Sequence, residues 1–206
     1  MHPFDFLPNT PIITGDDTSY YDGVDQHYLD ICRKKTILEI ATSSGIMASR
    51  ILLHNPQSLT MVEPFCIPTE VTLNDNVKHI SDDIHHWLDQ PRPAQVVIAF
   101  GLLYHLHSPL HLIELIVNFC DPETIILDNV TVPHPLAFNT ETNNVAGQRQ
   151  TLPGWKHAPF NMPTPFFIIN QSLNFMGYNL VKSHYLKTNW FPKSNGWIAE
   201  WTKNLN

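Results

Sequence analysis

The fold of this chain is decided by one stretch, Thr36-Ile37-Leu38-Glu39-Ile40-Ala41-Thr42-Ser43-Ser44-Gly45. Its first half is a compact, β-branched strand, and its second half is a turn of small residues. The apolar spacing that follows predicts a helix over 46–53, which ends before Asn55-Pro56. A strand that enters a helix through a tight turn opens a parallel α/β sheet, and such sheets bind ligands at the carboxyl ends of their strands.

The alternation of strand and helix continues along the chain and predicts an α/β fold with a mostly parallel sheet. The last two strands are joined by a connection too short for a crossover helix, so we expect the last strand to pair antiparallel. Helices should cover both faces of the sheet. The expected strands span residues 36–40, 59–62, 77–80, 95–100, 124–128, 179–185 and 196–202, and the expected helices span 20–32, 46–53, 82–88, 109–120 and 164–176.

Length and composition indicate a single domain. The chain has 206 residues, which is an ordinary size for one domain. Residues 1–20 are rich in Pro, Asp and Thr and predict an irregular N-terminal arm. Residues 129–162 are rich in Pro, Asn and Thr and interrupt the alternation of strands and helices. A long irregular insertion is typical of a functional loop, so we expect it to form a pocket or a lid.

Charge and hydropathy exclude several classes of partner. The chain has 12 Lys+Arg against 19 Asp+Glu, and a net charge of -7 does not attract nucleic acid or an anionic membrane. The longest apolar run, residues 96–106, is too short to span a bilayer, and the N-terminus lacks the pattern of a secretory signal. Cys32, Cys66 and Cys120 match neither a disulfide framework nor a zinc site. We therefore expect a soluble, cytoplasmic protein.

The turn over 41–45 is the candidate ligand site. Its single glycine and the absence of a following Gly-Lys-Ser or Gly-Lys-Thr argue against a phosphate cradle for NAD or ATP. The turn resembles instead the first motif of class I S-adenosylmethionine-dependent methyltransferases. Glu39 matches the acidic position of that motif and Gly45 its last glycine, whereas Ala41 and Ser43 replace the first two glycines. The resemblance implies S-adenosylmethionine as cofactor and a Rossmann-like methyltransferase fold with a seven-stranded sheet.

Acidic residues at the ends of the next two strands extend the resemblance. Glu63 stands about 20 residues beyond the first turn, where a ribose-binding carboxylate is expected. Asp83, in preference to the adjacent Asp82, matches the family's acidic residue near the adenine amino group, and Ile84 follows it in the same adenine-binding segment. Capping of a short helix is the alternative role of Asp83. Trp87 either covers the adenine face or packs in the core.

The segment over 96–109, VVIAFGLLYHLHSP, is the most specific match to the family. In the family pattern the residues at Phe100 and Gly101 line the methionine moiety, and those at Tyr104 and His105 face the active site. The sequence that follows Gly101 is similar to the corresponding segment in the tRNA uridine carboxymethyltransferase branch of the family. That branch uses cationic residues for an extra carboxylate, and these have no match here. The resemblance therefore implies the fold and the cofactor of the family, but it does not imply the substrate of this branch.

Methyl transfer from a sulfonium is an in-line displacement, which requires alignment of donor and acceptor and exclusion of water. His105 is the candidate general base, because an unperturbed histidine titrates near neutrality, and Tyr104 is the candidate for positioning the acceptor. The insertion would line the acceptor pocket with His134, Asn139, Trp155 and His157, each of which is otherwise an ordinary loop residue.

No metal ligand is assigned. His105, His107 and His111 are closely spaced, but they span a strand end, a turn and a helix start, with no acidic or cysteine ligand at a fitting distance. A metal-assisted reaction on a catechol-like acceptor, with Asp128 and Asn129 near the end of the fifth expected strand, is an alternative.

The acidic net charge favours a small-molecule acceptor over nucleic acid. Two other functions remain open. The first is a methyltransferase-like domain that binds a ligand without transferring a methyl group, which the replacements at Ala41 and Ser43 favour. The second is a tRNA-modifying (carboxy)methyltransferase. The sequence makes no prediction about the oligomeric state.

Overall fold

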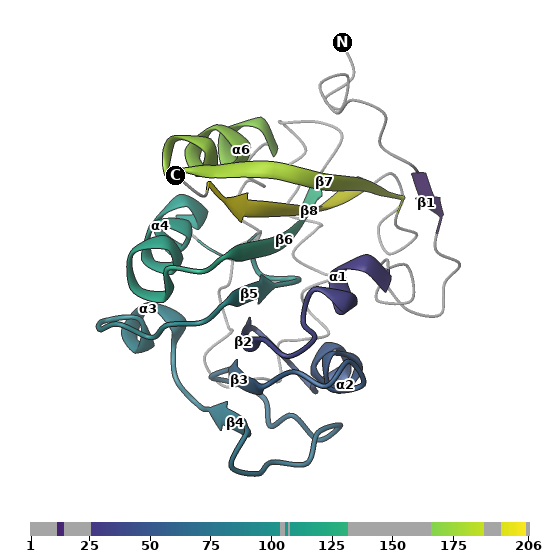
Figure 1. Ribbon diagram of the computed structural model, residues 1–206, viewed down its shortest axis with the longest axis vertical. Helices are drawn as coiled ribbons and strands as arrows, with labels where there is room; N and C mark the ends of the chain where they lie inside the picture. Colours follow the sequence, from purple (N-terminus) through teal and green to yellow (C-terminus); the bar gives the residue numbers. More distant parts are fainter. Residues whose placement is uncertain are drawn as a thin grey trace, which may run out of the picture.

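The computed structural model describes residues 12–14, 26–103, 106, 108–131, 166–187 and 195–204. They contain one open sheet of eight strands (Figure 1). The strands are β1 (Ile12–Thr14), β2 (Thr36–Ile40), β3 (Ser58–Val62), β4 (Val77–Ile80), β5 (Val96–Ala99), β6 (Thr124–Thr131), β7 (Tyr178–Lys187) and β8 (Asn195–Lys203). Their order across the sheet is β1-β7-β8-β6-β5-β2-β3-β4.

The pairing of the strands confirms the predicted mixed sheet. All pairs between β4 and β6 are parallel, whereas β8 pairs antiparallel with both β6 and β7. The four residues of β5 are all buried, as expected for an apolar strand in the middle of a parallel sheet that is covered on both faces. The seven strands predicted from the sequence are therefore present, and only the last of them is antiparallel.

An eighth strand, β1, joins the edge of the sheet from within the arm that was expected to be irregular. Its backbone pairs parallel with residues Tyr185 to Lys187 of β7. A segment of three residues is too short to show a period in the sequence, so it was not predicted. β6 also continues to Thr131, beyond the expected start of the insertion at residue 129, because its last residues pair with residues Asn195 to Trp197 of β8.

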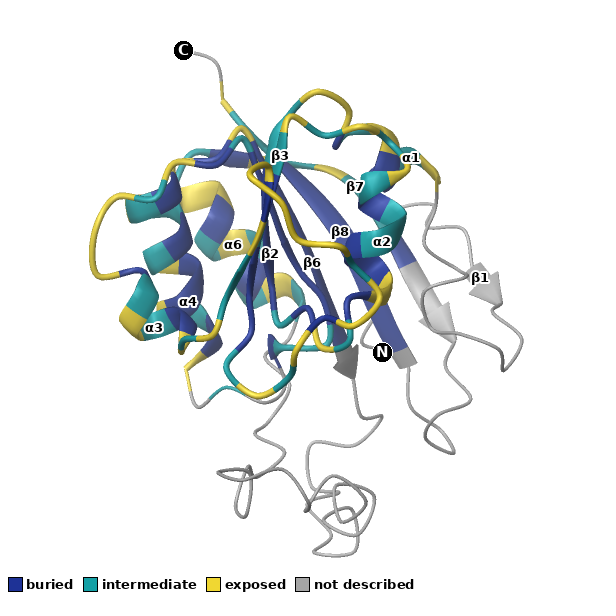
Figure 2. Ribbon diagram, turned by 90° about the horizontal axis from the view of Figure 1, so that it is seen from below, coloured by how far each residue is buried: buried dark blue, intermediate teal, exposed yellow. Residues whose placement is uncertain are grey.

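Helices cover both faces of the sheet, as the sequence predicted. They are α1 (Gln26–Asp30), α2 (Ile46–Leu52), α3 (Ile84–Trp87), α4 (Pro109–Leu115) and α6 (Phe166–Phe175). The expected helix over 109–120 continues from α4 as a π-helix, η2 (Ile116–Cys120), and ends at Asp121 in a left-handed conformation. Figures 1 and 2 show α1 and α2 on one face of the sheet and α3, α4 and α6 on the other.

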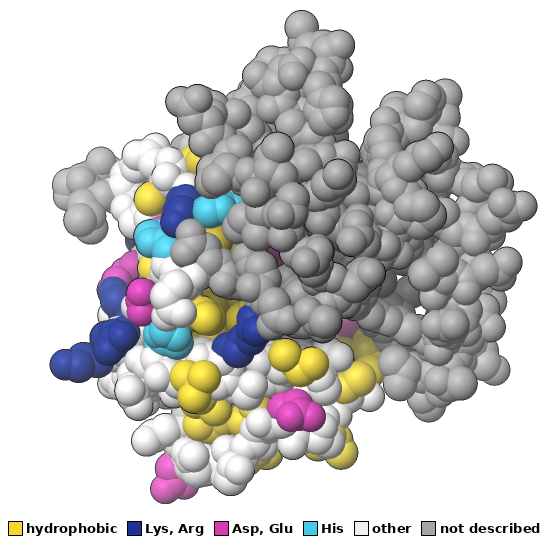
Figure 3. Space-filling model, turned by 90° about the vertical axis from the view of Figure 1, so that its right-hand side faces the viewer, with side chains coloured by type: hydrophobic (Ala, Val, Ile, Leu, Met, Phe, Trp, Pro, Cys, Tyr) yellow, Lys and Arg dark blue, Asp and Glu magenta, His cyan; other side chains and the backbone are white. Residues whose placement is uncertain are grey.

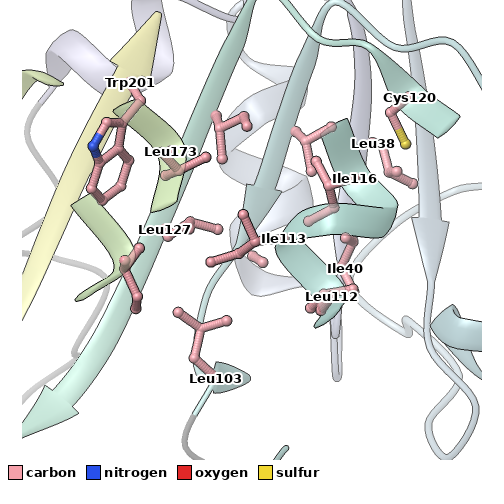
Figure 4. Close-up of a cluster of buried hydrophobic side chains, with 14 of the residues drawn as sticks. Leu38, Ile40, Leu103, Leu112, Ile113, Ile116, Cys120, Leu127, Leu173 and Trp201 are labelled. Carbon is pink, nitrogen blue, oxygen red and sulfur yellow. The ribbon is translucent and has the colours of Figure 1, made fainter. Parts of the chain in front are cut away.

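The hydrophobic core consists of one layer on each face, and the strands between the two layers are buried (Figure 2). In the layer under α4 and α6, Leu112, Ile113 and Ile116 point toward side chains of the sheet such as Leu38 and Leu127 (Figure 4). The same cluster includes Leu103, which is 0% exposed and follows β5. Burial of apolar surface is the main favourable contribution to folding, so this cluster also fixes the ends of the strands.

Two thiols predicted to be buried and inert are buried. Cys32 and Cys120 are free cysteines in the core, and burial raises the pKa of each thiol to about 12. A thiol with such a pKa stays protonated at neutral pH and is a poor nucleophile. In the part of the chain that is described, no helix combines the length and the apolar character needed to cross a bilayer.

Candidate functional site

The turn after β2 lies where the carboxyl ends of the central parallel strands meet. Ile40 pairs with Val62 of β3 on one side and with Ala99 of β5 on the other, so the carboxyl ends of three parallel strands meet there. The chain proceeds outward from β2 to β3 and β4 and then returns to β5 on the opposite side of β2. Ligands of open α/β sheets bind at such a reversal of strand order.

The backbone of this turn is left-handed at three alternate positions. The φ angles are 62° at Ala41, 53° at Ser43 and 91° at Gly45. The left-handed conformation costs a residue with a side chain about 1–2 kcal/mol. Ala41 and Ser43 thus adopt the conformation that glycine would favour, and the two replacements leave the left-handed turn in place.

A segment beyond β3 packs directly against Gly45. A Cβ atom added at Gly45 would lie 3.0 Å from Cβ of Pro68 and 3.0 Å from Cγ2 of Val71. The backbone N–H of Glu70 also donates a hydrogen bond to the carbonyl of Ser44 at 3.1 Å. Glycine at position 45 is therefore required both by its φ angle and by the close approach of this segment.

The carboxylate of Glu63 joins the end of β3 to the turn. Glu63 is 6% exposed; its Oε2 accepts a hydrogen bond from the Ser43 N–H at 3.0 Å, and its Oε1 accepts one from the Phe65 N–H at 2.9 Å. A carboxylate has about four acceptor positions, so each oxygen can accept one further hydrogen bond. Glu63 is therefore oriented by the backbone and can still receive hydroxyl donors from a ligand.

Glu39 is buried beneath the same turn. It is 3% exposed, and the hydroxyl of Thr42 donates a hydrogen bond to its Oε2 at 2.9 Å. Burial raises the pKa of Glu39 to about 7; the Thr42 hydrogen bond opposes this shift and the neighbouring Glu63 carboxylate adds to it. Glu39 thus titrates near neutral pH inside the turn rather than remaining permanently ionised.

Residues predicted to contact adenine occupy the start of α3. Asp83 is its N-cap, and Asp83 Oδ1 accepts a hydrogen bond from the His85 N–H at 2.8 Å. The side chain of Ile84 is buried in the core. Trp87 packs against the same cluster, and the Arg92 guanidinium lies 5.0 Å from the centre of its ring. The structure shows the capping role that was considered for Asp83, and its contact with adenine stays a prediction.

A buried carboxyl holds the turn after β5. Gly101 has a φ angle of 68°, and its N–H donates a hydrogen bond of 2.7 Å to Oδ1 of Asp128. Asp128 is 0% exposed, and burial raises its pKa to about 8. Phe100 is buried in the layer under α1 and α2. The sequence suggested Asp128 only for the metal-assisted alternative, and its contact with Gly101 was not predicted.

The two predicted catalytic residues, Tyr104 and His105, lie outside the described residues. The turn that carries them is anchored by Leu103 in the core, and Leu106 donates a hydrogen bond to the Leu103 carbonyl at 3.3 Å. The other predictions outside the described residues are those at His107, His134, Asn139, Trp155 and His157. Their roles stay predictions.

Among the described residues, no group of three His, Cys, Asp or Glu side chains is arranged so that it could hold a metal ion. The imidazole of His111 stacks on that of His85 at 5.8 Å, and its Nδ1 lies 3.7 Å from a carboxylate oxygen of Glu114. These contacts are local interactions on the surface of α3 and α4.

Hydrophobic side chains border the turn on the described surface. Figure 3 shows the face that carries α1 and α2, where hydrophobic side chains gather in the lower part and charged side chains of both signs are scattered. The exposed apolar residues of α2 and of the segment after β3 include Ile46, Phe65, Ile67 and Leu73. An apolar border of this kind suits a ligand that is partly hydrophobic.

Comparison with known proteins gives a family match. A family model described as a methyltransferase domain matches residues 22–164, which is more than half of the chain. That range includes the turn after β2, Glu63 and the Gly101–Asp128 contact. No curated protein matches the sequence significantly.

Solved structures share the fold at low sequence identity. Magnesium protoporphyrin IX methyltransferase (ChlM) from Synechocystis PCC 6803 with bound S-adenosylhomocysteine is 12% identical, with a TM-score of 0.59 over 92% of this chain and 90% of that one. The [4+2]-cyclase SpnF is 11% identical, with a TM-score of 0.64 over 93% and 86%. LepI in complex with S-adenosylmethionine is 14% identical, with a TM-score of 0.56 over 93% and 50%. At these identities the similarity establishes the fold alone.

Proposed function

The chain belongs to the methyltransferase-domain family, and from this membership we propose that it binds S-adenosylmethionine and methylates a small-molecule acceptor. The observation that carries the proposal is the turn after β2, which is left-handed at Ala41, Ser43 and Gly45 and is held by Glu63. Its place at the reversal of strand order is where an α/β sheet binds a nucleoside. Two proteins of similar fold are described with S-adenosylhomocysteine or S-adenosylmethionine bound.

The described residues fit the cofactor in chemistry. Glu63 retains acceptor positions for the two ribose hydroxyls, and it is already oriented by the N–H groups of Ser43 and Phe65. Asp83 and Ile84 would lie at the adenine, and Phe100 and Gly101 at the methionine moiety. Glu39, Ala41, Ser43 and Gly45 would form the floor of the site beneath the nucleoside, as the family resemblance implies.

When bound, the cofactor supplies an electrophilic methyl group on a sulfonium sulfur. We assign to His105 the role of general base, which takes the proton from an acceptor that must lose one, and to Tyr104 the role of positioning the acceptor. Leu103, 0% exposed in the core, anchors the turn that carries both residues. The part of the predicted insertion over 129–162 that follows β6 would exclude water and complete the acceptor pocket.

A small molecule is the acceptor that we propose, because the net charge of -7 disfavours a polyanionic substrate. The alternative is a tRNA-modifying (carboxy)methyltransferase, which rests on the resemblance of the segment after Gly101. The cytoplasmic location expected from the sequence stays a prediction.

A second candidate is a domain that binds a ligand without methylating it. One observation supports this candidate: SpnF has the same architecture and is described as a [4+2]-cyclase. A shared fold therefore does not imply a shared activity. The replacements at Ala41 and Ser43 favour it too, although the turn keeps its left-handed shape.

The proposal is tested by measuring S-adenosylhomocysteine formation by the whole chain. One arm supplies a panel of small hydroxyl, amine and carboxylate compounds, and a second arm supplies bulk tRNA. We expect turnover in the first arm, its loss in Glu63→Ala, and its retention in Glu70→Ala, whose side chain is exposed near the same turn. Turnover with tRNA alone would favour the tRNA-modifying alternative, and binding without turnover in either arm would favour the second candidate.

A further inference from the structure

Asp128 has a buried carboxyl group in which only one of the two oxygens forms a hydrogen bond with a described residue. Its Oδ1 accepts the Gly101 N–H at 2.7 Å, whereas its Oδ2 has no hydrogen-bond partner among the described residues. The side chain is 0% exposed. An unsatisfied buried carboxyl oxygen is costly, so it is an unusual feature in a folded domain. Asp128 also lies at the sheet edge that carries the candidate site, because Leu127 pairs with Ala99 at the end of β5.

The titratable groups around Asp128 supply no direct cation among the described residues. Asp128 pairs with Ile198 on β8, and Ile198 pairs with His184 on β7, so the histidine lies two strands away, roughly 10 Å. Oε2 of Glu200 on β8 lies 2.6 Å from Nε2 of His27 on α1. On β2, the buried acid is Glu39, which is itself paired with Thr42. Among the described residues, Asp128 therefore has a carboxylic acid and imidazoles in its surroundings but forms no ion pair.

Burial keeps Asp128 protonated in the empty protein. Its pKa is raised to about 8 by burial, although the Gly101 hydrogen bond opposes the shift. With such a pKa, most molecules carry the proton at pH 7. An opposite charge within about 4–6 Å would favour the ionised form. A ligand that places a cation beside the Gly101 turn should therefore displace this proton.

We propose that Asp128 is the counter-charge for the sulfonium of S-adenosylmethionine, and that its carboxyl gives up its proton to solvent when this ligand binds. The inference rests on the proposed function, in which the methionine moiety lies at Phe100 and Gly101. S-adenosylhomocysteine differs at the same place by having a neutral thioether in place of the sulfonium. It offers Asp128 no cation, and its binding leaves the carboxyl protonated.

Discrimination between the two ligands then depends on pH. Below the pKa of Asp128, binding of S-adenosylmethionine must release a proton, so its Kd falls about tenfold for each unit of rising pH. The Kd of S-adenosylhomocysteine does not share this dependence. Rising pH therefore improves binding of the charged donor relative to the neutral product until Asp128 is ionised in the empty protein, which favours exchange of one for the other.

Calorimetry on the whole chain tests this inference without a methyl acceptor. Each ligand is titrated at pH 7 in phosphate and in Tris, whose different ionisation enthalpies reveal the number of protons released. We expect S-adenosylmethionine to release more protons than S-adenosylhomocysteine, by most of one proton. Asp128→Asn keeps an oxygen for the Gly101 N–H but cannot ionise, so it should abolish the release; Asp75→Asn, at an exposed residue away from the site, is the matched control.

The outcomes separate this inference from the proposed function. If both ligands bind and release equal numbers of protons, or if Asp128→Asn releases as many as the wild type, the role of Asp128 is wrong while the cofactor site stands. If neither ligand binds the wild type, the proposed function itself fails. Should Asp128→Asn not fold, the difference between the two ligands in the wild type at pH 7 and pH 9 still decides, because the extra release by S-adenosylmethionine should be clearly smaller at pH 9 and an unchanged difference would overturn the role of Asp128.

Discussion

The Glu63 carboxylate accepts a hydrogen bond from the backbone N–H of Ser43 at 3.0 Å, so the end of β3 holds the turn that follows β2. The second oxygen of Glu63 accepts the N–H of Phe65 at 2.9 Å. One side chain therefore links the turn, the end of β3 and the segment beyond it. Glu63 has a role in the stability of the empty protein in addition to its proposed role at the ribose.

Replacement of Glu63 by alanine should destabilise the protein even without a ligand. Two partly buried hydrogen bonds, from the backbone N–H groups of Ser43 and Phe65, lose their acceptor, which should lower the free energy of unfolding by about 1–3 kcal/mol. Urea unfolding followed by circular dichroism measures this change. Glu70→Ala, at an exposed side chain nearby, should stay within about 0.5 kcal/mol of the wild type. Equal midpoints for the two variants would contradict the linking role of Glu63.

Glycine at position 41 or 43 should stabilise the turn. Ala41 and Ser43 have φ angles of 62° and 53°, so glycine would relieve a cost of about 1–2 kcal/mol and lose about 0.5–1 kcal/mol through the greater freedom of the unfolded chain. We expect Ala41→Gly and Ser43→Gly each to raise the free energy of unfolding by about 0.5 kcal/mol. Ser49→Gly within α2 is the control and should lower it. Destabilisation of all three by the same amount would argue against left-handed backbone at these sites.

Two glycines with similar backbone angles should respond differently to alanine. Gly45 and Gly177 have φ angles of 91° and 87°, but only at Gly45 would a Cβ meet neighbouring atoms, 3.0 Å away on Pro68 and Val71. Both substitutions introduce backbone strain of about 1–2 kcal/mol. Gly45→Ala should add the cost of displacing the segment after β3, so its loss of stability should exceed that of Gly177→Ala by at least about 1 kcal/mol. Thermal unfolding of the pair measures the difference, and equal losses would show that the segment does not pack on the turn.

The pH dependence of stability should report the burial of Glu39. Its pKa rises on folding from 4.5 to about 7, so the unfolded state loses its proton first and stability falls as the pH rises through this window. Glu39→Gln does not ionise and should gain stability relative to the wild type between pH 4.5 and pH 7, by on the order of 3 kcal/mol at most. Denaturant midpoints at several pH values measure the gain. The exposed Glu70→Gln variant should run parallel to the wild type, and a Glu39→Gln curve that also runs parallel would refute the shift.

Much of the fold followed from local pattern. The unbroken apolar run of Val96–Ala99 indicated a central strand, and the short link between the last two strands indicated their antiparallel pairing. The strand β1 did not follow, because three residues have no measurable period and their pairing depends on the edge that β7 offers. The extension of β6 to Thr131 likewise depends on its partner, β8.

The candidate site was predictable where spacing carries the information. Glu39 and Gly45 were identified from their resemblance to the family's first motif, and Glu63 from that resemblance and its distance from the turn. The structure places all three around one turn. The left-handed angles of Ala41 and Ser43 were not predictable, because neither residue favours them. The contact of Asp128 with Gly101 spans 27 residues of sequence and depends on the register of β5 against β6.

Calorimetric titration of the intact chain with S-adenosylmethionine tests the central claim most directly. We expect saturable binding of one molecule per chain, weakened by Glu63→Ala through the loss of about 1–3 kcal/mol, which is roughly a tenfold to hundredfold rise in Kd. The Glu70→Ala variant should bind like the wild type. No heat from the wild type at millimolar ligand would contradict the account, and unchanged affinity in Glu63→Ala would show that the ribose does not lie at the end of β3.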